Sequence, residues 1–202
     1  MNILIAGATG NTGLRLVEQL KRNGHSPIAL VRESSDTGSL PQDVALRRGD
    51  LTDLKSGVCD GCDAVIFAAG SGGSTGPEMT DKVDRDGAKR LIDLAAEAGV
   101  SRFVMLSSAG AEDPDPESEL GHYLQAKHEA DEHLKASGLD YAILRPVSLT
   151  DDDGTRDMRF GDDVDPEGKA ARGDVAAVLA TAVDDGEWTG KALLMQSVLA
   201  DG

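Results

Sequence analysis

Short apolar runs and segments with apolar residues at helical spacing alternate along the whole chain. Runs of this length predict buried strands, and apolar residues three and four positions apart predict helices that bury one face. The predicted strands are 2–6, 27–32, 44–50, 63–70, 102–108, 140–146 and 191–197. The predicted helices are 11–24, 82–99, 120–138 and 172–186, with a short helical turn near 51–57.

The regular alternation of strands and helices predicts βαβ units with parallel strands and right-handed crossovers. We therefore predict an α/β fold: a single doubly wound parallel sheet, or Rossmann fold, with helices on both faces. No linker divides the chain, so we expect one domain, 1–202. The irregular, acidic segment 147–170 is the expected substrate-side region and a minimal C-terminal cap. Ligands of such sheets bind at the carboxyl ends of the strands.

The charge balance limits the class of partner. The 202 residues include 36 acidic and 20 basic ones, a net charge of −16. Such a surface repels nucleic acid and anionic membranes, so we expect a small-molecule partner and a monomer or homodimer. Many carboxylates with few lysines suit concentrated salt, which screens self-repulsion, and we hypothesise a halophilic source. Without a signal-peptide pattern or an apolar stretch of membrane-spanning length, the expected location is the cytoplasm.

Two cysteines, Cys59 and Cys62, form a C-x-x-C pattern. This spacing occurs in redox pairs and in one half of a zinc site. The sequence has no second cysteine pair, its four histidines lack zinc-finger spacing, and the pattern precedes a strand instead of opening a helix. We interpret it as a turn with two small apolar residues and expect no metal site.

The sequence GATGNTG, residues 7–13, lies between the first predicted strand and the first predicted helix. In a dinucleotide site the first glycine permits a tight turn, the second lets backbone approach the pyrophosphate and the third permits close helix–strand packing. The helix N-terminus attracts the anion. The alternative is a tight turn without a ligand. The candidate cofactor contacts here are Gly7, Thr9, Gly10, Asn11, Thr12 and Gly13.

Residues that follow the next strands predict the type of dinucleotide. NAD-selective sites place an acid after the second strand to bind the ribose diol, whereas Arg32 suits a 2′-phosphate. We therefore predict NADP, although Glu33 follows the same strand. Asp50 is a candidate acceptor for the adenine amino group or, alternatively, an N-cap, and Leu51 is expected to pack on the ring. The remaining candidate cofactor contacts are Ala68, Ala69, Gly70, Ser107, Lys127 and Pro146.

Tyr123 and Lys127 lie four positions apart on a predicted helix and therefore share one face. A lysine ammonium beside a phenol favours the phenolate, which makes the tyrosine a usable general acid near neutral pH. Lys127 is also a candidate donor to the nicotinamide ribose. Ser108 ends a predicted strand and is a candidate to polarise a substrate carbonyl. Taken singly, these features are also explained by surface packing or turn capping.

Together these motifs resemble the short-chain dehydrogenase/reductase superfamily. The segments GATGNTG, GDLTD, AVIFAAG, RFVMLSSAG, YLQAK and LDYAILRP occur in that order and cover nearly the whole chain. The chain is similar to the atypical NAD(P)-binding branch, with NAD-dependent epimerases, NmrA-like proteins and flavin- and biliverdin-reductase-like proteins as relatives. The resemblance implies Ser108, Tyr123, Lys127 and Asp84 as the candidate catalytic residues. Asp84 stands where the usual tetrad has Asn, and an ionised Asp cannot donate as Asn does.

The expected function is NADP(H)-dependent reduction of a small carbonyl, quinone or flavin-like substrate. Two alternatives stay open: a sugar epimerase-like enzyme that oxidises its substrate transiently, and a non-catalytic NADP-sensing regulatory protein. The Ser–Tyr–Lys set favours the enzyme, whereas Asp84 and the small cap favour the sensor. The loops 71–77 and 112–119 are candidate lids over the site.

Overall fold

The computed structural model describes residues 1–71 and 75–198. Its main sheet has eight strands in the order β3-β2-β1-β4-β5-β6-β10-β8. The bounds are β1 Asn2–Ala6, β2 Ser26–Val31, β3 Ala45–Arg48, β4 Ala64–Phe67, β5 Arg102–Leu106, β6 Asp140–Pro146, β8 Met158–Phe160 and β10 Lys191–Ser197. A second sheet pairs β7 (Ser148–Thr150) with β9 (Lys169–Ala171).

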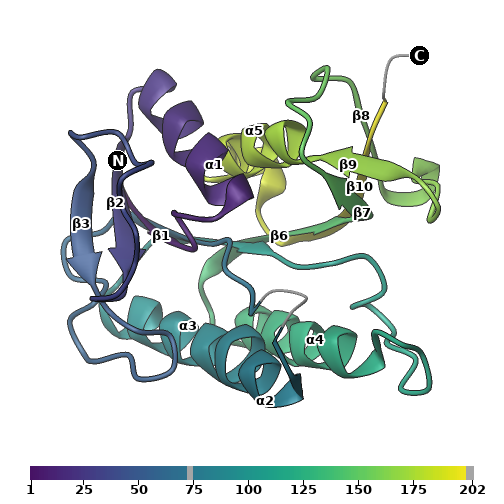
Figure 1. The fold of residues 1–202 in the computed structure, drawn as a ribbon, viewed down its shortest axis with the longest axis horizontal. Helices are drawn as coiled ribbons and strands as arrows, with labels where there is room; N and C mark the ends of the chain where they lie inside the picture. The colour runs from purple at the N-terminus through teal and green to yellow at the C-terminus, as the bar shows by residue number, and fades with distance from the viewer. Residues whose placement is uncertain (72–74, 199–202) are drawn as a thin grey trace.

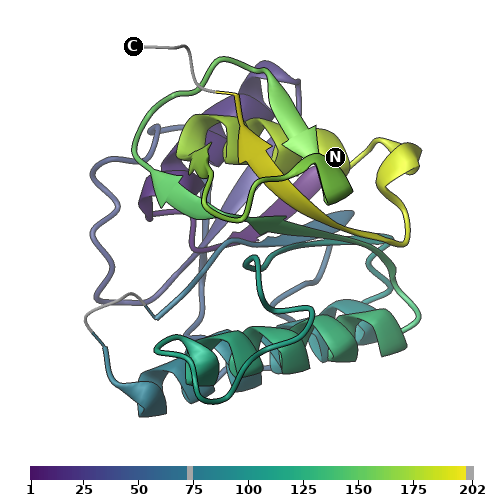
Figure 2. The ribbon, with the colours of Figure 1, turned by 90° about the vertical axis from the view of Figure 1, so that its right-hand side faces the viewer.

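Helices cover both faces of the main sheet, as the alternation of elements predicts. The helices are α1 Asn11–Arg22, α2 Pro77–Thr80, α3 Ala88–Glu97, α4 Gly121–Ala136 and α5 Arg172–Ala182. A π-helical segment, η1 (Asp81–Gly87), joins α2 to α3, and single 3₁₀ turns are η2 (Gly161–Asp163) and η3 (Gly186–Trp188). In Figure 1, α1 and α5 lie above the sheet, and α2, α3 and α4 lie below it. Figure 2 shows the same three layers from the side.

The central strands β1, β4 and β5 are buried because helices cover both faces, so their apolar runs are continuous instead of alternating. All residues of β4 and β5 are buried. The side chains form two core clusters, one under α1 and α5 and the other under α3 and α4. The predicted doubly wound α/β fold is confirmed.

Three local predictions need correction. Residues 51–57 form turns and no helix, because Asp50 caps a turn at Thr52 that does not continue. The predicted helix 82–99 starts earlier and includes the π-helical η1, where Gly87 allows close approach to the Leu51 carbonyl oxygen. The segment 147–170 is not wholly irregular, since it holds β7, β8 and the start of β9. β8 pairs antiparallel with β10, so it is the exception in an otherwise parallel sheet.

None of the helices in the described ranges, 1–71 and 75–198, is long and apolar enough to cross a membrane.

Candidate functional site

The turn between β1 and α1 is built for an approaching ligand. Gly7 has a φ of +86°, and a Cβ there would lie 2.6 Å from the backbone of Ala68 on the neighbouring strand end. At Gly13 a Cβ would lie 2.0 Å from the Gly7 carbonyl oxygen, so this glycine permits the contact of helix and turn. At Gly10 a Cβ would meet only the Gly7 oxygen, at 3.4 Å, and the space beyond is open.

The N-terminus of α1 is not capped by a side chain of the described residues. Gly10 is the N-cap, no side chain caps it, and the first turn carries no acidic residue. The amide N–H groups of a helix start and the helix dipole both favour a negative charge there. Open space at Gly10 and an uncapped helix start together fit the pyrophosphate of a dinucleotide.

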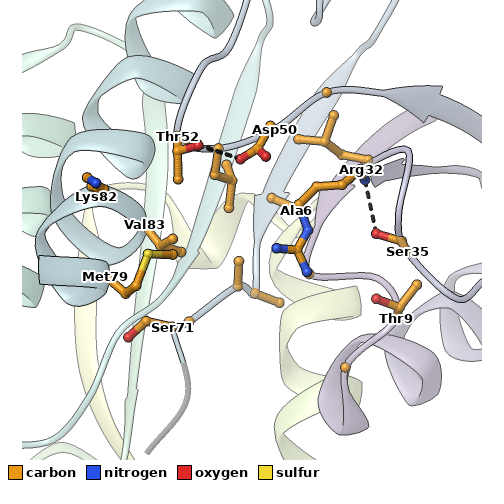
Figure 3. Close-up of a pocket in the computed structure, with 18 of the residues that line it drawn as sticks. Ala6, Thr9, Arg32, Ser35, Asp50, Thr52, Ser71, Met79, Lys82 and Val83 are labelled. Carbon is orange, nitrogen blue, oxygen red and sulfur yellow. Dashed lines mark hydrogen bonds between the residues drawn. The ribbon is translucent and has the colours of Figure 1, made fainter. Parts of the chain in front are cut away.

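A cavity of about 680 Å³ lies along the carboxyl ends of β1, β2, β3 and β4. Of the predicted cofactor contacts, nine line it: Gly7, Thr9, Gly10, Arg32, Asp50, Leu51, Ala68, Ala69 and Gly70. Figure 3 shows Met79, Lys82 and Val83 on one side of this cavity, opposite Arg32, Ser35 and Thr9. Sequence reasoning missed Met79, Lys82 and Val83, because no local pattern shows that α2 and η1 turn back over the strand ends.

Arg32 and Asp50 lie at the ends of adjacent strands and both line the cavity. The Oδ1 atom of Asp50 accepts hydrogen bonds from the Thr52 backbone N–H at 2.9 Å and from its hydroxyl at 2.8 Å. These bonds, helped by the positive charge of Arg32, lower the pKa of Asp50. Asp50 therefore caps the turn, as the alternative interpretation predicts, while its contact with adenine stays a prediction.

Asn11 contacts the segment after β7, and Thr12 contacts the first residue of α5. The Asn11 amide donates to Asp151 Oδ1 at 3.1 Å, and Arg172 donates to the same oxygen at 2.8 Å. Arg172 also donates to the Thr12 hydroxyl at 3.2 Å. We call these four residues the Asp151 clasp. It fastens the segment 147–170 to the first turn of α1.

Lys127 on α4 forms a buried ion pair with Asp84 on η1. Lys127 Nζ lies 3.0 Å from Asp84 Oδ1, and the two side chains are 3% and 0% exposed. The other carboxylate oxygen of Asp84 accepts a hydrogen bond from the Ser71 backbone N–H at 2.9 Å. Asp84 therefore connects α4 to the loop after β4, whose Ser71 lines the cavity.

The ammonium of Lys127 faces the cavity end of the sheet. It lies 3.5 Å from the carbonyl oxygens of Ala69 and Leu106, which follow β4 and end β5. Its Nζ is also 5.7 Å from the centre of the half-buried Tyr123 ring. Burial disfavours the charge of Lys127, but the nearby acidic groups of Tyr123 and Asp84 outweigh burial and raise its pKa.

Ser107 and Ser108 have different surroundings. The buried Ser107 hydroxyl donates to Asp131 Oδ2 at 2.8 Å, and Arg145 on β6 donates to the same oxygen at 3.0 Å. Burial raises the pKa of Asp131, which Arg145 and Ser107 oppose in part. Ser108 is half-buried and donates to the neighbouring Ala109 carbonyl oxygen at 3.2 Å.

Sequence reasoning missed Asp131, although its spacing holds a signal. It lies four positions after Lys127, as Lys127 does after Tyr123, so all three share one stripe of α4. Pro146, the last predicted cofactor contact, is buried at the end of β6. The candidate lid 71–77 is described only in part, because residues 72–74 lie outside the described residues.

Cys59 and Cys62 are buried free thiols in a turn, where the Cys62 N–H donates to the Cys59 carbonyl oxygen at 3.1 Å. Arg47 donates to Cys62 Sγ at 3.2 Å. Burial raises the pKa of Cys59 to about 12. Within residues 1–71 and 75–198, no group of His, Cys, Asp and Glu side chains could hold a metal ion.

Comparison with known proteins supports the dinucleotide site. Residues 7–186 match the model of a family described as NAD(P)H-binding. The uncharacterised sugar epimerase YhfK of Bacillus subtilis is 39% identical over 193 residues, which cover 92% of this chain and 89% of YhfK.

Two solved structures have the same fold. One, from Bacillus halodurans and provisionally named an NAD-dependent epimerase/dehydratase, has a TM-score of 0.91 and 36% identity over 98% of this chain and 94% of its own. The other, the oxidoreductase ylbE from Lactococcus lactis, has a TM-score of 0.85 and 30% identity over 98% and 91%. With the glycine turn, the open helix start and the cavity, these matches show that the chain belongs to the NAD(P)H-binding family of Rossmann-fold proteins.

Proposed function

We propose that the chain is an NADP(H)-dependent reductase of the atypical short-chain dehydrogenase/reductase type. Its substrate is a small carbonyl, quinone or flavin-like molecule. The observation that carries the proposal is the position of Lys127 and Tyr123. They lie together on α4, and the Lys127 ammonium lies 3.5 Å from the carbonyl oxygen of Ala69, a residue that lines the dinucleotide cavity. The acid–base pair and the cofactor site are therefore adjacent.

NADPH, when bound, supplies the hydride. The Tyr123 hydroxyl donates its proton to the substrate oxygen as that oxygen gains negative charge. This transfer leaves Tyr123 as a phenolate. The Lys127 ammonium stabilises that phenolate from the next helical turn. Ser108 is the hydrogen-bond donor that polarises the substrate oxygen before the proton moves, after a rotation of its hydroxyl away from the Ala109 carbonyl.

Asp84 keeps Lys127 charged in the absence of solvent. An isolated ammonium that is 3% exposed would lose its proton, whereas the carboxylate at 3.0 Å favours the ammonium form. The Ser71 N–H donates a hydrogen bond to the other carboxylate oxygen of Asp84. We propose that this buried pair replaces the Asn of the usual tetrad as the group that positions Lys127.

Arg32 supports the choice of NADP over NAD. Its side chain extends into the cavity, where Figure 3 shows it facing Thr9 and Ala6. A guanidinium binds a phosphate with paired, charge-assisted hydrogen bonds, and the Ser35 hydroxyl nearby adds a neutral donor.

Tyr123→Phe tests the enzymatic role. We expect turnover of NADPH with a panel of aldehydes, quinones and flavins to fall by about 10²–10⁴-fold, because the general acid is lost. The affinity for NADPH, measured by its fluorescence, should stay unchanged. Tyr141→Phe is the matched control, since the chain's other tyrosine lies on β6 with its carbonyl bonded to Gly190.

The alternatives give different results in the same assays. Binding of NADPH without turnover of any panel member would favour a regulatory NADP sensor. The name of YhfK gives a reason to include sugars in the panel. Interconversion of two sugar epimers without net consumption of NADPH would favour an epimerase. Equal loss of turnover in both tyrosine variants would contradict the role of Tyr123.

A further inference from the structure

The ends of β2 and β3 bring two arginines together. Val31 of β2 is in register with Arg48 of β3, so Arg48 ends its strand beside Arg32. One guanidinium nitrogen of Arg48 donates to the Arg32 carbonyl oxygen at 2.9 Å. The same oxygen accepts from the Ser35 backbone N–H at 3.1 Å, and the Ser35 hydroxyl accepts from the Arg32 N–H at 3.0 Å. The backbone of Arg32 is therefore fixed on both sides.

Arg48 also engages the acid that follows Arg32. The Nε atom of Arg48 lies 3.7 Å from Glu33 Oε1, and Glu33 lies outside the lining of the cavity. An acid at this place is the group that binds the ribose diol in NAD-selective sites. The exposed pair adds little to stability. Its consequence is local: it places the Glu33 carboxylate beside Arg48 of β3.

The charges around Arg32 explain why a second arginine matters. Asp50, near Arg32 at the end of the adjacent strand, is ionised, because hydrogen bonds from Thr52 and the charge of Arg32 keep its pKa low. Arg32 and Arg48 therefore balance Asp50 and Glu33, and the four side chains together are neutral. Without Arg48 the other three of these side chains would carry a net negative charge, in a chain whose net charge is already −16. A 2′-phosphate carries about two negative charges, so it would bind there more weakly.

We propose that Arg48 is a second specificity-determining residue for the 2′-phosphate of NADP, because it fixes Arg32, neutralises Glu33 and adds positive charge at the end of β3. This inference rests on the proposed use of NADP. It goes beyond the role of Arg32 alone, because it assigns the selectivity for NADP to the combined charge of the side chains at the ends of β2 and β3.

The test is a double-mutant cycle of Arg48→Ala and Glu33→Ala, in which the Kd values of the protein for NADPH and for NADH are measured. For Arg48→Ala, we expect the ratio of the NADH Kd to the NADPH Kd to fall about tenfold, about 1.4 kcal/mol. In the Glu33→Ala background, the same substitution should change the ratio by only about threefold, because the acid it neutralises is gone. Arg22→Ala, an exposed arginine of α1 paired with Glu18, is the control and should leave the ratio unchanged.

The outcomes separate this inference from the proposed function. A wild-type protein that binds both cofactors equally would overturn the NADP proposal and this inference together. A second outcome would overturn only the role of Arg48. In it, the wild type prefers NADPH, Arg32→Ala removes that preference and Arg48→Ala leaves it intact, so the NADP proposal stands. An effect of Arg48→Ala that is the same with and without Glu33 would contradict the charge balance. Circular dichroism of each variant identifies any loss of folding.

Discussion

The Nζ atom of Lys127 and the Oδ1 atom of Asp84 lie 3.0 Å apart, and both side chains are closed off from solvent. The two residues come from different elements, α4 and the π-helical η1. A buried pair of this kind is a weak source of stability when compared with apolar side chains, but it is costly to break. Its effect here is to fix the position and the charge of Lys127 beside Tyr123.

Asp84→Asn should lower both the stability of the protein and the pKa of Lys127. It leaves a buried ammonium facing a neutral amide, which costs about 3–5 kcal/mol of unfolding free energy. Because the folded state raises the pKa of Lys127, this stabilisation is present at neutral pH. It is lost as the pH rises above about 10 and through the folded pKa. Urea unfolding at neutral and alkaline pH measures both effects.

Asp86→Asn is the control for this substitution. Asp86 lies in the same π-helical segment, but its side chain is 58% exposed and pairs with Arg85. Its loss should change the unfolding free energy by less than about 1 kcal/mol. Equal losses for the two variants would show that the burial of the Asp84 pair has no special effect.

Two glycines of the turn should respond differently to alanine. Gly13→Ala places a Cβ 2.0 Å from the Gly7 carbonyl oxygen, so we expect a loss of about 1–3 kcal/mol or more and a lower Tm. Gly10→Ala has space for its methyl group, so its Tm should stay near that of the wild type while the affinity for NADPH falls. Gly186→Ala, with nothing within 4 Å, is the neutral control. Tight NADPH binding by Gly10→Ala would argue against pyrophosphate at that glycine.

The sequence predicts the strand ends of this site well and the opposite wall poorly. Gly7, Arg32 and Asp50 follow apolar runs directly, so the rule that parallel sheets bind ligands at their carboxyl ends locates them. Met79 and Lys82 face the same cavity from a segment that is separated from β4 by a loop. The path of a loop depends on contacts that are distant in sequence, and no periodicity reports it.

The proposed catalytic residues show the same difference between local and tertiary signals. The spacing of Tyr123 and Lys127 predicts their shared face, because helical geometry is local. The partners of these residues were not predictable in the same way, since Asp84 reaches Lys127 through tertiary packing of η1 on α4. For Asn11 and Thr12, the motif predicted contact with a cofactor. The structure adds side-chain contacts with Asp151 and Arg172, which no local pattern indicates.

The two thiols should be unreactive in the folded protein. The pKa of Cys59 is raised to about 12, mainly by burial, so almost no thiolate is present at pH 8. Burial also raises the pKa of Cys62, which Arg47 opposes in part. Labelling with Ellman's reagent should be slow for the native chain, complete after unfolding, and faster for Cys59→Ser than for Cys62→Ser. Rapid labelling of both native thiols, or a bound metal, would contradict the turn interpretation.

Salt should stabilise the fold if the acidic surface reflects a halophilic source. With a net charge of −16, carboxylates repel one another in dilute buffer, and molar KCl screens that repulsion. We expect the Tm to rise steadily between dilute buffer and molar KCl. The same salt titration on Asp84→Asn should show a similar rise in Tm. The buried ion pair that this variant lacks is shielded from the added ions, so it contributes little to the salt dependence. A wild-type Tm that is the same in dilute buffer and in molar KCl would contradict the halophile hypothesis.

The Asp151 clasp links early and late parts of the chain. Asn11 and Asp151 are 140 positions apart, and Thr12 and Arg172 are 160 apart. During synthesis the glycine turn leaves the ribosome roughly 10–30 s before the arginine that closes on it. Closing so long a loop carries an entropic cost that the contacts of the folded chain offset. The first turn of α1 therefore gains these contacts only after Arg172 has been synthesised, and a chain cut short before Arg172 would lack the hydrogen bond to Thr12.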